Sequence, residues 1–521
     1  MGLGEHGILR HTAHVASLTL VSRILGYVRD RLLASLLGTS TWADAFYIAF
    51  RIPNTFRRFV AEGAMTAALV PVMTRSMKED PPESAWLFAR RFLYVFALLL
   101  LLLTAAGTLA APVIARLMAW RYAQEAPAVF ALTERLTAHL FPYLLFVSLA
   151  AVAMGILNSR EIFAPSALAP ALLNVAIITA ALLWGHRSGN PTGVLAWAVL
   201  AGGALQFLIQ VPFLLREGMS FAPAFSLSDP RVRRVFQLMV PAAMGAGVGQ
   251  ITLLVGTALA GLAGEGAVAA LYYANRVTEL AFGILAVSLA TVIFPRLSSL
   301  VAMGDRKELE GTLSRALEAV LYFLLPATAG ILALCSPIVR VLFETGRFSA
   351  HSVSLTSGPL TAYAAGMVLW GAAAVLVRVC HAHQDMLSPF RAGLLSLAVF
   401  VATALGLLRH FGAAGIAAAS STAALANLLA LLLAVVRRHR VRLPWRRLVQ
   451  ALARDAGLSA AIGLLSFWLW GALPHSGRLA AAGALAGAVG AGALAYLGGS
   501  WVLGFPEARR LREIFGSGPS R

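Results

Sequence analysis

The stretch SRILGYVRDRLLASLLGTSTWADAFYIAFRIPNTFRRFVAE, residues Ser22–Glu62, decides how the rest of the chain is interpreted. It is apolar enough to enter a membrane, and apolar sequence flanks it on both sides. Ionisable groups at membrane depth are costly and usually face a protein interior or a water-filled cavity. The stretch therefore predicts a functional site inside a membrane protein. Its ionisable side chains are Arg23, Arg29, Asp30, Arg31, Asp44, Arg51, Arg57, Arg58 and Glu62.

The composition of the whole chain is that of a membrane protein. Of its 521 residues, 59% are hydrophobic and only 12% are charged, and the mean hydropathy is +0.78. Ordinary soluble domains carry about 25% charged residues. Two cysteines, Cys335 and Cys380, both lie in apolar segments, so we expect small core residues and neither a disulfide nor a metal site. The composition predicts an all-α integral membrane protein.

Apolar runs of about twenty residues predict membrane-spanning helices, because a helix rising about 1.5 Å per residue must cross about 30 Å of hydrocarbon. The sequence has about 14 such runs, and the first two are the weakest because of their charges. Their limits are 12–37, 43–74, 87–111, 128–157, 163–185, 192–215, 232–262, 267–295, 314–343, 353–382, 386–408, 412–436, 452–473 and 477–504.

Basic residues are distributed unevenly among the tails and connections of these runs. If the N-terminus is cytoplasmic, the cytoplasmic tails, loops and helix ends hold 26 of the 42 Lys and Arg residues, and the opposite loops hold seven. This excess follows the positive-inside rule and predicts that both termini are cytoplasmic. It also accounts for most of the net charge of +19 without nucleic acid as a partner. Nine arginines remain inside spans, six of them in the opening stretch.

The chain contains a weak internal repeat. ADAFYIAFR resembles VAALYYANR 225 residues later, and two proline pairs are 224 residues apart. The common offset predicts a duplicated unit of six helices, and an even number of spans per unit makes the two copies parallel. The paired positions are Arg51 and Arg276, Pro71 and Pro295, and Pro165 and Pro389.

The repeat predicts three parts: an N-lobe (1–220), a C-lobe (221–440) and a C-terminal helix pair with a cytoplasmic tail (441–521). The two six-helix lobes would surround a central cavity. Its walls would be the first, second, seventh and eighth spans, where the intramembrane charge is concentrated.

Spacing within the helices suggests how the charges pair. Arg23 and Asp30, seven residues apart, lie on nearly one helical face, either as a structural pair or facing the cavity. Arg29 and Arg31 point elsewhere, toward the cavity or toward an interface. Asp44 is either a helix N-cap or a charge at the cavity mouth. Two further pairs have helical spacing: Arg58 with Glu62 at i,i+4, and Arg276 with Glu279 at i,i+3.

Several arginines in one membrane cavity favour an anionic substrate. A guanidinium is a planar group that binds phosphate oxygens through paired hydrogen bonds and keeps its charge when partly desolvated. A cationic drug would instead require carboxylates and aromatic rings. The sequence shows no P-loop, HExxH motif or Cys/His cluster, and His381 and His383 in CHAHQD are better explained as a helix end. We therefore expect a transporter and not an enzyme, without a cofactor.

Six segments resemble the MurJ (MviN) family of bacterial lipid II flippases, which belongs to the multidrug/oligosaccharidyl-lipid/polysaccharide exporter superfamily. The resemblance runs over nearly the whole chain and is densest in residues 15–75 and 265–300. It implies fourteen helices and a bacterial inner-membrane location. It also implies transport of lipid II, the undecaprenyl-diphosphate-linked peptidoglycan precursor, to the outer leaflet. The segments are SRILGYVRD, ADAFYIAFRIPN, FRRFVAEGA with LVPV, FPYLL, GILNS and YYANRVTE.

The resemblance also implies roles for individual residues. Arg57 is the member of its pair that aligns with the family's substrate-binding arginine, and the last two helices would form a groove for the lipid tail. The chain departs from the family at Asn275, where the family often has an acidic residue. It also has no acidic residue in 232–262, so we expect membrane potential or an undefined ion to drive transport rather than sodium. The implied functional charges are Arg23, Arg29, Asp30, Asp44, Arg57, Glu62, Arg276 and Glu279.

These observations predict an alternating-access lipid II flippase for cell-wall synthesis. Arg23, Arg29, Arg57 and Arg276 would bind the diphosphate. The supporting charges would be Asp30, Asp44, Arg58, Glu62 and Glu279. Expected partners are lipid II, membrane lipids and the cell-wall synthesis machinery, around a monomer. The alternatives are a flippase for another polyprenyl-diphosphate oligosaccharide such as an O-antigen unit, a cation-coupled multidrug exporter, and a non-transporting scaffold.

Overall fold

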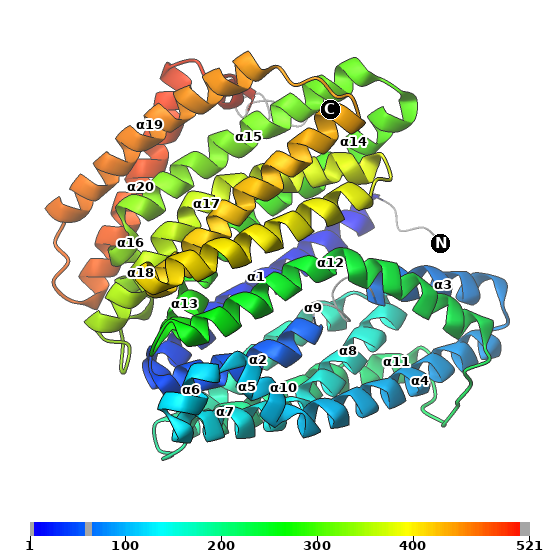
Figure 1. Ribbon diagram of the computed structural model, residues 1–521. Helices are drawn as coiled ribbons and strands as arrows, with labels where there is room; N and C mark the ends of the chain where they lie inside the picture. The colour runs from blue at the N-terminus through cyan, green and yellow to red at the C-terminus, as the bar shows by residue number, and fades with distance from the viewer. Residues whose placement is uncertain (1–4, 58–64, 511–521) are drawn as a thin grey trace. The chain divides into compact units, whose positions relative to one another are not determined.

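Every secondary-structure element is a helix in residues 5–57 and 65–510, the part of the chain that the computed structural model describes (Figure 1). Side chains are described for these residues except 5–19, 66–67 and 241–246. The all-α prediction is confirmed. The chain divides into two compact units: unit 1 comprises Met1–Ala269 with Thr345–Phe348, and unit 2 comprises Ala270–Glu344 with Ser349–Arg521.

Unit 1 contains the helices of the N-terminal half and one further long helix, α12. They are α1 (Glu5–Leu37), α2 (Thr41–Arg57), α3 (Met65–Glu79), α4 (Pro82–Leu109), α5 (Ala111–Met118), α6 (Trp120–Glu125), α7 (Pro127–Leu140), α8 (Pro142–Ser159), α9 (Ala164–Ala180), η2 (Ala181–Gly185), α10 (Pro191–Leu208), α11 (Val211–Arg216) and α12 (Pro230–Leu262).

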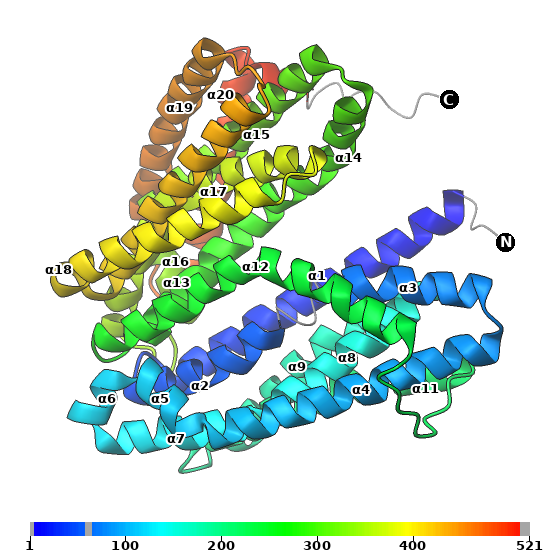
Figure 2. The same cartoon turned by 45° about the vertical axis from the view of Figure 1, so that its right-hand side comes forward.

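Packing in unit 1 joins the charged first helices to the apolar ones. Helix α1 packs on α9, α2 on α7, and α12 on α3 (Figures 1 and 2). Phe92 and Phe96 of α4 contact Phe236 of α12, with ring centroids 5.8 and 6.2 Å apart. This aromatic contact fixes α12 to unit 1 through buried apolar surface.

Unit 2 contains the remaining helices, apart from the first three residues of α13. They are α13 (Ala267–Phe282), η3 (Gly283–Val287), α14 (Ser288–Met303), α15 (Arg306–Ala333), α16 (Cys335–Phe343), α17 (Ala350–Ala382), α18 (Leu387–Leu433), η4 (Ala434–Arg438), α19 (Trp445–Ala472) and α20 (Arg478–Val502).

The last two helices pack on α15, which lies beside α19 in both views (Figures 1 and 2). The buried Tyr322 hydroxyl of α15 forms a 2.8 Å hydrogen bond with the Ser500 hydroxyl of α20. At Gly463 a side chain would meet the Ala329 carbonyl at 3.2 Å, so glycine allows α19 to approach α15 closely. The C-terminal pair is therefore an integral part of unit 2.

In the described residues, ten helical segments are long and apolar enough to cross a membrane. One of them, Leu387–Arg438, contains Gly412 with non-helical φ of 52° and ψ of −129°, which separates the predicted runs 386–408 and 412–436. The predicted runs 12–37, 43–74 and 232–262 are not among the ten. The second and third of these runs are described only in part, without residues 58–64 and without the side chains of 241–246, and the first carries Arg23, Arg29, Asp30 and Arg31. A total of fourteen spans stays a prediction.

The boundary between the two compact units, after Ala269, falls later in the sequence than the predicted lobe boundary between residues 220 and 221. Helix α12, expected to begin the C-lobe, belongs to unit 1 by its contacts. The predicted lobes describe a sequence repeat and the units describe packing, so the assignment of lobes stays a prediction.

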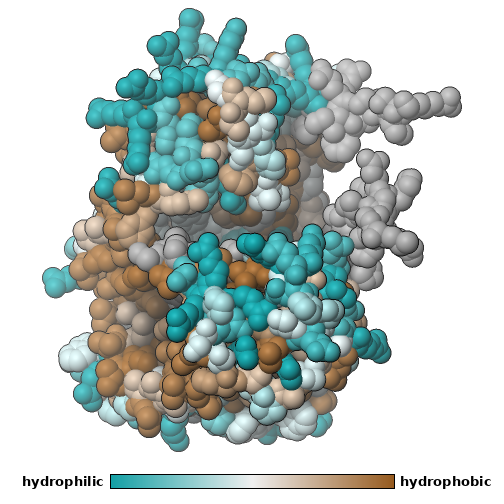
Figure 3. All heavy atoms as spheres, turned by 90° about the vertical axis from the view of Figure 1, so that its right-hand side faces the viewer, coloured by the Kyte–Doolittle hydropathy of each residue, from teal (hydrophilic) through white to brown (hydrophobic). Residues whose placement is uncertain are grey.

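Hydrophilic side chains gather at one end of the helices in Figure 3, the end that includes the α3–α4 connection and the start of α12. In unit 1, Arg231 of α12 contacts Asp229 at 3.1 Å and Asp80 at 2.8 Å, and it lies over the Phe88 ring at 5.1 Å. Burial opposes ionisation of Asp229, but hydrogen bonds from Arg231 and Arg91 outweigh it and lower the pKa of this carboxyl. Arg231 thus fastens α12 to the α3–α4 connection.

Candidate functional site

The opening stretch forms an arginine–carboxylate cluster in unit 1. Arg29 of α1 donates from Nη2 to Asp30 Oδ1 at 2.7 Å and from Nη1 to Asn174 Oδ1 at 2.9 Å. Asn174 of α9 also donates to the carbonyl of Ser22 at 3.1 Å. The Arg29 and Asp30 side chains are only 11% and 7% exposed. Helix α9 therefore holds the Arg29 guanidinium in one orientation. Because the ion pair is buried, removing either of its members would be strongly destabilising.

The other arginines of α1 lie differently. Arg31 is half-buried and donates to the Tyr27 hydroxyl at 3.3 Å, whereas Arg23 is exposed. The sequence placed Arg23 and Asp30 on nearly one helical face. In the structure Asp30 is buried and takes Arg29 as its ion-pair partner. Helical spacing did not predict this pair, because adjacent residues of a helix normally point in different directions.

Arg57 lies in the last turn of α2 and is half-buried. Its Nε donates to Asn54 Oδ1 at 3.0 Å. This bond engages one of its nitrogens with a neutral group, so the positive charge is not neutralised by that contact. The predicted pair Arg58 and Glu62 lies outside the described residues.

Asp44 of α2 is fully buried and accepts three hydrogen bonds. The Tyr122 hydroxyl donates at 2.6 Å, and the backbone N–H groups of Gly266 and Ala269 donate at 2.8 Å each. Two of these donors lie at the beginning of α13, so the carboxylate caps that helix. Gly266 has φ of 76°, and a side chain there would clash with the carbonyl of Thr39. Only glycine permits this close approach.

Asp44 does not cap its own helix, which was one of the two alternatives that the sequence left open. Helix α2 begins at Thr41, and the Ser40 hydroxyl accepts from the N–H of Ala43 at 3.3 Å. A serine already occupies the capping position of α2. Asp44, one turn inside the helix, caps α13, which is more than 200 residues away in the sequence.

In unit 2, Arg276 and Glu279 form the predicted i,i+3 pair on α13, with Nη1 and Oε2 3.0 Å apart. Arg276 also donates to the Tyr272 hydroxyl at 3.2 Å, and its guanidinium lies 5.0 Å from the centre of that ring. The side chains are 30% and 39% exposed, so they are better solvated than Arg29 and Asp30. The Arg276 guanidinium is therefore oriented by Glu279 and by the Tyr272 ring, both on its own helix, and it is partly exposed.

Three contributing residues were missed by the sequence analysis: Asn174, Tyr122 and Tyr272. An isolated asparagine in the apolar run of α9 is the type of residue that usually has a function within a membrane, and that signal was available. No sequence signal pointed to Tyr122, because only the tertiary fold brings its hydroxyl to Asp44.

The described residues contain no group of three or more His, Cys, Asp or Glu side chains that could hold a metal ion. Both cysteines are buried, as expected for small core residues. Asp385 lies two residues before α18 and accepts from the N–H of Ser388 at 3.0 Å. Burial opposes its ionisation, but hydrogen bonds from Ser388 and the charge of Arg438 lower its pKa.

Comparison with solved structures shows which folds resemble that of this chain. The inward-facing structure of a multidrug resistance MATE family transporter of the MOP superfamily aligns with a TM-score of 0.67 at 15% identity, covering 85% of this chain and 98% of that chain. The two proteins therefore share a fold. A structure described as lipid II flippase MurJ, inward closed conformation, aligns with a TM-score of 0.78 at 26% identity, covering 94% of this chain and 98% of that chain.

Sequence comparison gives the particular family. Residues 33–480 match the family described as lipid II flippase MurJ. The probable lipid II flippase MurJ of Rhizobium tropici is 36% identical over 87% of this chain and 86% of its own length. The lipid II flippase MurJ of Burkholderia cenocepacia is 32% identical over 96% and 98%. The chain belongs to the MurJ lipid II flippase family, a family of bacterial multi-pass membrane transporters and not of enzymes.

Proposed function

We propose that this chain moves lipid II from the cytoplasmic to the outer leaflet of the bacterial inner membrane. Membership of the MurJ family supports this substrate. The single observation that carries the mechanism is a buried arginine of unit 1 that is held in one orientation, Arg29 on Asp30 and Asn174. A fixed guanidinium binds a diphosphate without first having to be ordered.

The roles of the charged residues follow from their contacts. Arg29 and Arg57 of unit 1 and Arg276 of unit 2 each bind the diphosphate during the transport cycle. Asp30 and Glu279 orient their arginine neighbours and stabilise them when the substrate leaves. Arg23, which is exposed, binds the head group on entry. Each arginine supplies charge-assisted hydrogen bonds, which are stronger than neutral ones.

The lipid tail has a fitting apolar pocket in unit 2. A cavity of about 450 Å³ lies between α15, α19 and α20, with Phe323, Ile462 and Leu497 among its lining residues. Polyprenyl chains are apolar, and an apolar cavity removes the surface of such a chain from contact with water. We propose that the C-terminal helices hold the tail while the head group is carried across.

The membrane arrangement is part of the proposal. Fourteen helices cross the membrane as two parallel six-helix lobes and a C-terminal pair, and both termini are cytoplasmic. Movement of the two lobes exposes the substrate site to one side of the membrane and then to the other. The positive-inside distribution of Lys and Arg supports this orientation. Residues 232–262 contain no carboxylate, which favours the membrane potential as the driving force.

A head-group competition assay in proteoliposomes tests this function. Reconstituted protein with labelled lipid II in one leaflet should transport it, and excess unlabelled lipid II should compete. An O-antigen-type undecaprenyl-diphosphate glycan carries the same diphosphate but other sugars, so poor competition by it would show that this chain recognises the head group of lipid II beyond the diphosphate. Equal competition would indicate a general polyprenyl-diphosphate flippase. Competition by a cationic drug, but not by lipid II, would indicate a multidrug exporter.

A further inference from the structure

We propose that the arginine-rich connection between α18 and α19 binds the head groups of anionic phospholipids, which in the proposed orientation belong to the cytoplasmic leaflet. This α18–α19 connection, residues 437–447, holds six of the 42 Lys and Arg residues within eleven positions and no carboxylate. The positive-inside rule accounts for the side of the membrane on which these arginines lie, but not for their concentration in one connection. They are Arg437, Arg438, Arg440, Arg442, Arg446 and Arg447.

The α18–α19 connection is fixed to the body of unit 2. Val441 and Leu443 are only 4% and 7% exposed. The backbone N–H of Arg442 donates to Glu310 Oε1 of α15 at 2.7 Å. Exposed and buried residues alternate from Arg440 to Leu443, so Arg440 and Arg442 are presented on the outside while the residues between them anchor the chain. The arginines therefore form a defined surface.

Two of the six arginines are neutralised by buried carboxylates. Arg447 binds Glu318 through two hydrogen bonds, of 2.6 and 2.8 Å, and Arg438 contacts Asp385 at 3.4 Å. Six arginines less these two leave four, all of them exposed, and among the described residues no carboxylate pairs with their side chains. A cluster of about four basic residues beside a spanning helix attracts anionic lipid.

The surface changes from basic to aromatic to apolar along α19. Trp445, the first residue of α19, is 51% exposed. Val449 and Leu452, four and seven residues later on the same helical face, are 60% and 43% exposed. The helix advances about 10 Å from Trp445 to Leu452, toward the hydrocarbon. A phospholipid presents the same order: a charged head group, the interface where tryptophan is enriched, and an acyl chain. A soluble phosphate or an acidic protein segment would leave the apolar stripe unused.

The start of α19 adds to the attraction for phosphate. Pro444 is the N-cap residue, and no side chain caps the first turn. The N-terminus of a helix favours an anion, because its first N–H groups and the helix dipole both point toward it. Arg446, the second residue of α19, lies beside this helix start and would bind the same phosphate.

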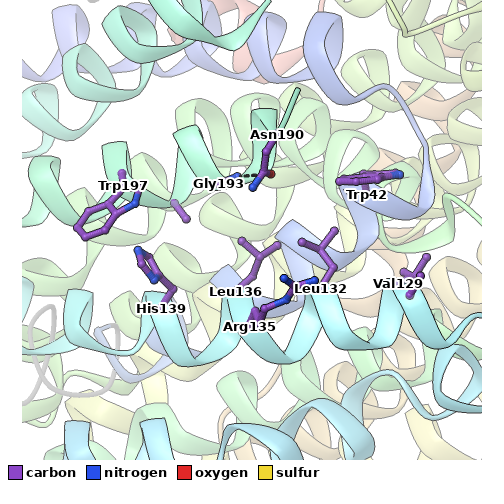
Figure 4. A pocket seen from close by; sticks show the side chains of 11 residues that line it. Trp42, Val129, Leu132, Arg135, Leu136, His139, Asn190, Gly193 and Trp197 are labelled. Atoms are coloured by element: carbon purple, nitrogen blue, oxygen red, sulfur yellow. Dashed lines mark hydrogen bonds between the residues drawn. The ribbon is translucent and has the colours of Figure 1, made fainter. Parts of the chain in front are cut away.

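A pocket in unit 1 shows that exposed tryptophans and apolar lining alone do not make such a surface. This α7–α10 pocket has a volume of about 550 Å³, and its lining includes Trp42, Trp197 and a single arginine, Arg135. Figure 4 shows the two tryptophans at opposite ends of the pocket, so they do not mark one membrane level. Arg135 is therefore a matched control, an exposed arginine beside apolar surface but outside a basic cluster.

Lipid binding to the purified full-length chain tests the inference. Native mass spectrometry in detergent would compare phosphatidylglycerol with phosphatidylcholine of the same acyl chains. The wild type should prefer phosphatidylglycerol, and Arg442→Gln and Arg446→Gln should each reduce that preference about fivefold, the equivalent of about 1 kcal/mol for one basic residue at a lipid surface. In detergent there is no bilayer surface, so a charge counts only where a lipid is bound. Arg135→Gln, and Arg234→Gln at the exposed start of α12, should therefore behave as wild type.

Location is checked with a phosphatidylglycerol that carries a photoactivatable group on its acyl chain. Crosslinked peptides should include residues 445–452 in the wild type and should decrease in the double variant Arg442→Gln/Arg446→Gln. Crosslinks absent from residues 445–452, or unchanged in the double variant, would overturn the proposal. An equal response of Arg446→Gln and the two control variants would do so as well. Equal binding of both lipids would also overturn it, because it would show acyl-chain contact without head-group recognition.

Discussion

Asp44 and Asp30 are both buried carboxylates of unit 1, yet their partners are of opposite kinds. Asp44 accepts three hydrogen bonds from neutral donors, the Tyr122 hydroxyl and two backbone N–H groups. Asp30 pairs with the guanidinium of Arg29, which also reaches Asn174. A carboxylate surrounded by neutral donors fixes the backbone, whereas one beside an arginine fixes a cation that can bind substrate. Under the proposed function, the partners of these two carboxylates, and not their burial, distinguish a structural role for Asp44 from a role for Asp30 in substrate binding.

The largest effect is expected from removing the arginines. Arg57→Ala and Arg276→Ala should abolish growth complementation in a bacterium depleted of its own flippase, with normal membrane levels of the protein, because each removes a diphosphate-binding cation. Arg340→Ala is the matched control, since Arg340 is 51% exposed and pairs with Glu344 on its own helix. Full complementation by both Arg57→Ala and Arg276→Ala would refute the diphosphate assignment.

Asp44→Ala should act on stability. It leaves three donors buried without an acceptor, which costs on the order of 3 kcal/mol of unfolding free energy. Thermal unfolding in detergent, followed by the loss of monodisperse protein, should show a lower midpoint and reduced membrane levels. Tyr122→Phe removes a single donor and should cost about 1 kcal/mol. If Asp44→Ala unfolds at the wild-type temperature, Asp44 is not a structural cap.

Asn174→Leu tests the orientation of Arg29 without removing a charge. It eliminates the 2.9 Å hydrogen bond to the guanidinium, and the Arg29–Asp30 pair remains. Transport in proteoliposomes should fall several-fold and not disappear, since one hydrogen bond to a charged group is worth about 1.5–3 kcal/mol. Asn427→Leu, within α18 of unit 2, offers the same substitution far from this cluster in the sequence. An effect of Asn174→Leu no larger than that of Asn427→Leu would contradict a positioning role.

The smallest effect concerns pH and Asp229. Its pKa is lowered in the folded chain, so the ionised form contributes stability above the unfolded pKa of about 3.9, and this contribution is lost as pH falls through the folded value. The unfolding midpoint should therefore decrease below about pH 4. Asp229→Asn should show a weaker decrease over the same range. An identical pH profile for both proteins would exclude the Asp229–Arg231 contact as a source of stability.

Local features were predictable from the sequence, and long-range contacts were not. The helical runs and the i,i+3 pair of Arg276 and Glu279 both depend on neighbours within a few residues. The partners of Asp44 are Tyr122, Gly266 and Ala269, which the fold alone brings together. The placement of α12 in unit 1 likewise depends on Phe236 and Arg231, whose partners lie in or beside α4. No periodicity in α12 itself encodes that choice.

The central claim is that arginines of this chain carry the lipid II diphosphate across the membrane. Leaflet-resolved measurement of lipid II tests it most directly, in cells depleted of their own flippase and expressing this chain or its Arg276→Ala variant. We predict that the wild-type chain restores lipid II to the outer leaflet and that the variant leaves it in the inner leaflet. Equal outer-leaflet lipid II in the two strains, or accumulation in the inner leaflet with the wild-type chain, would contradict the claim.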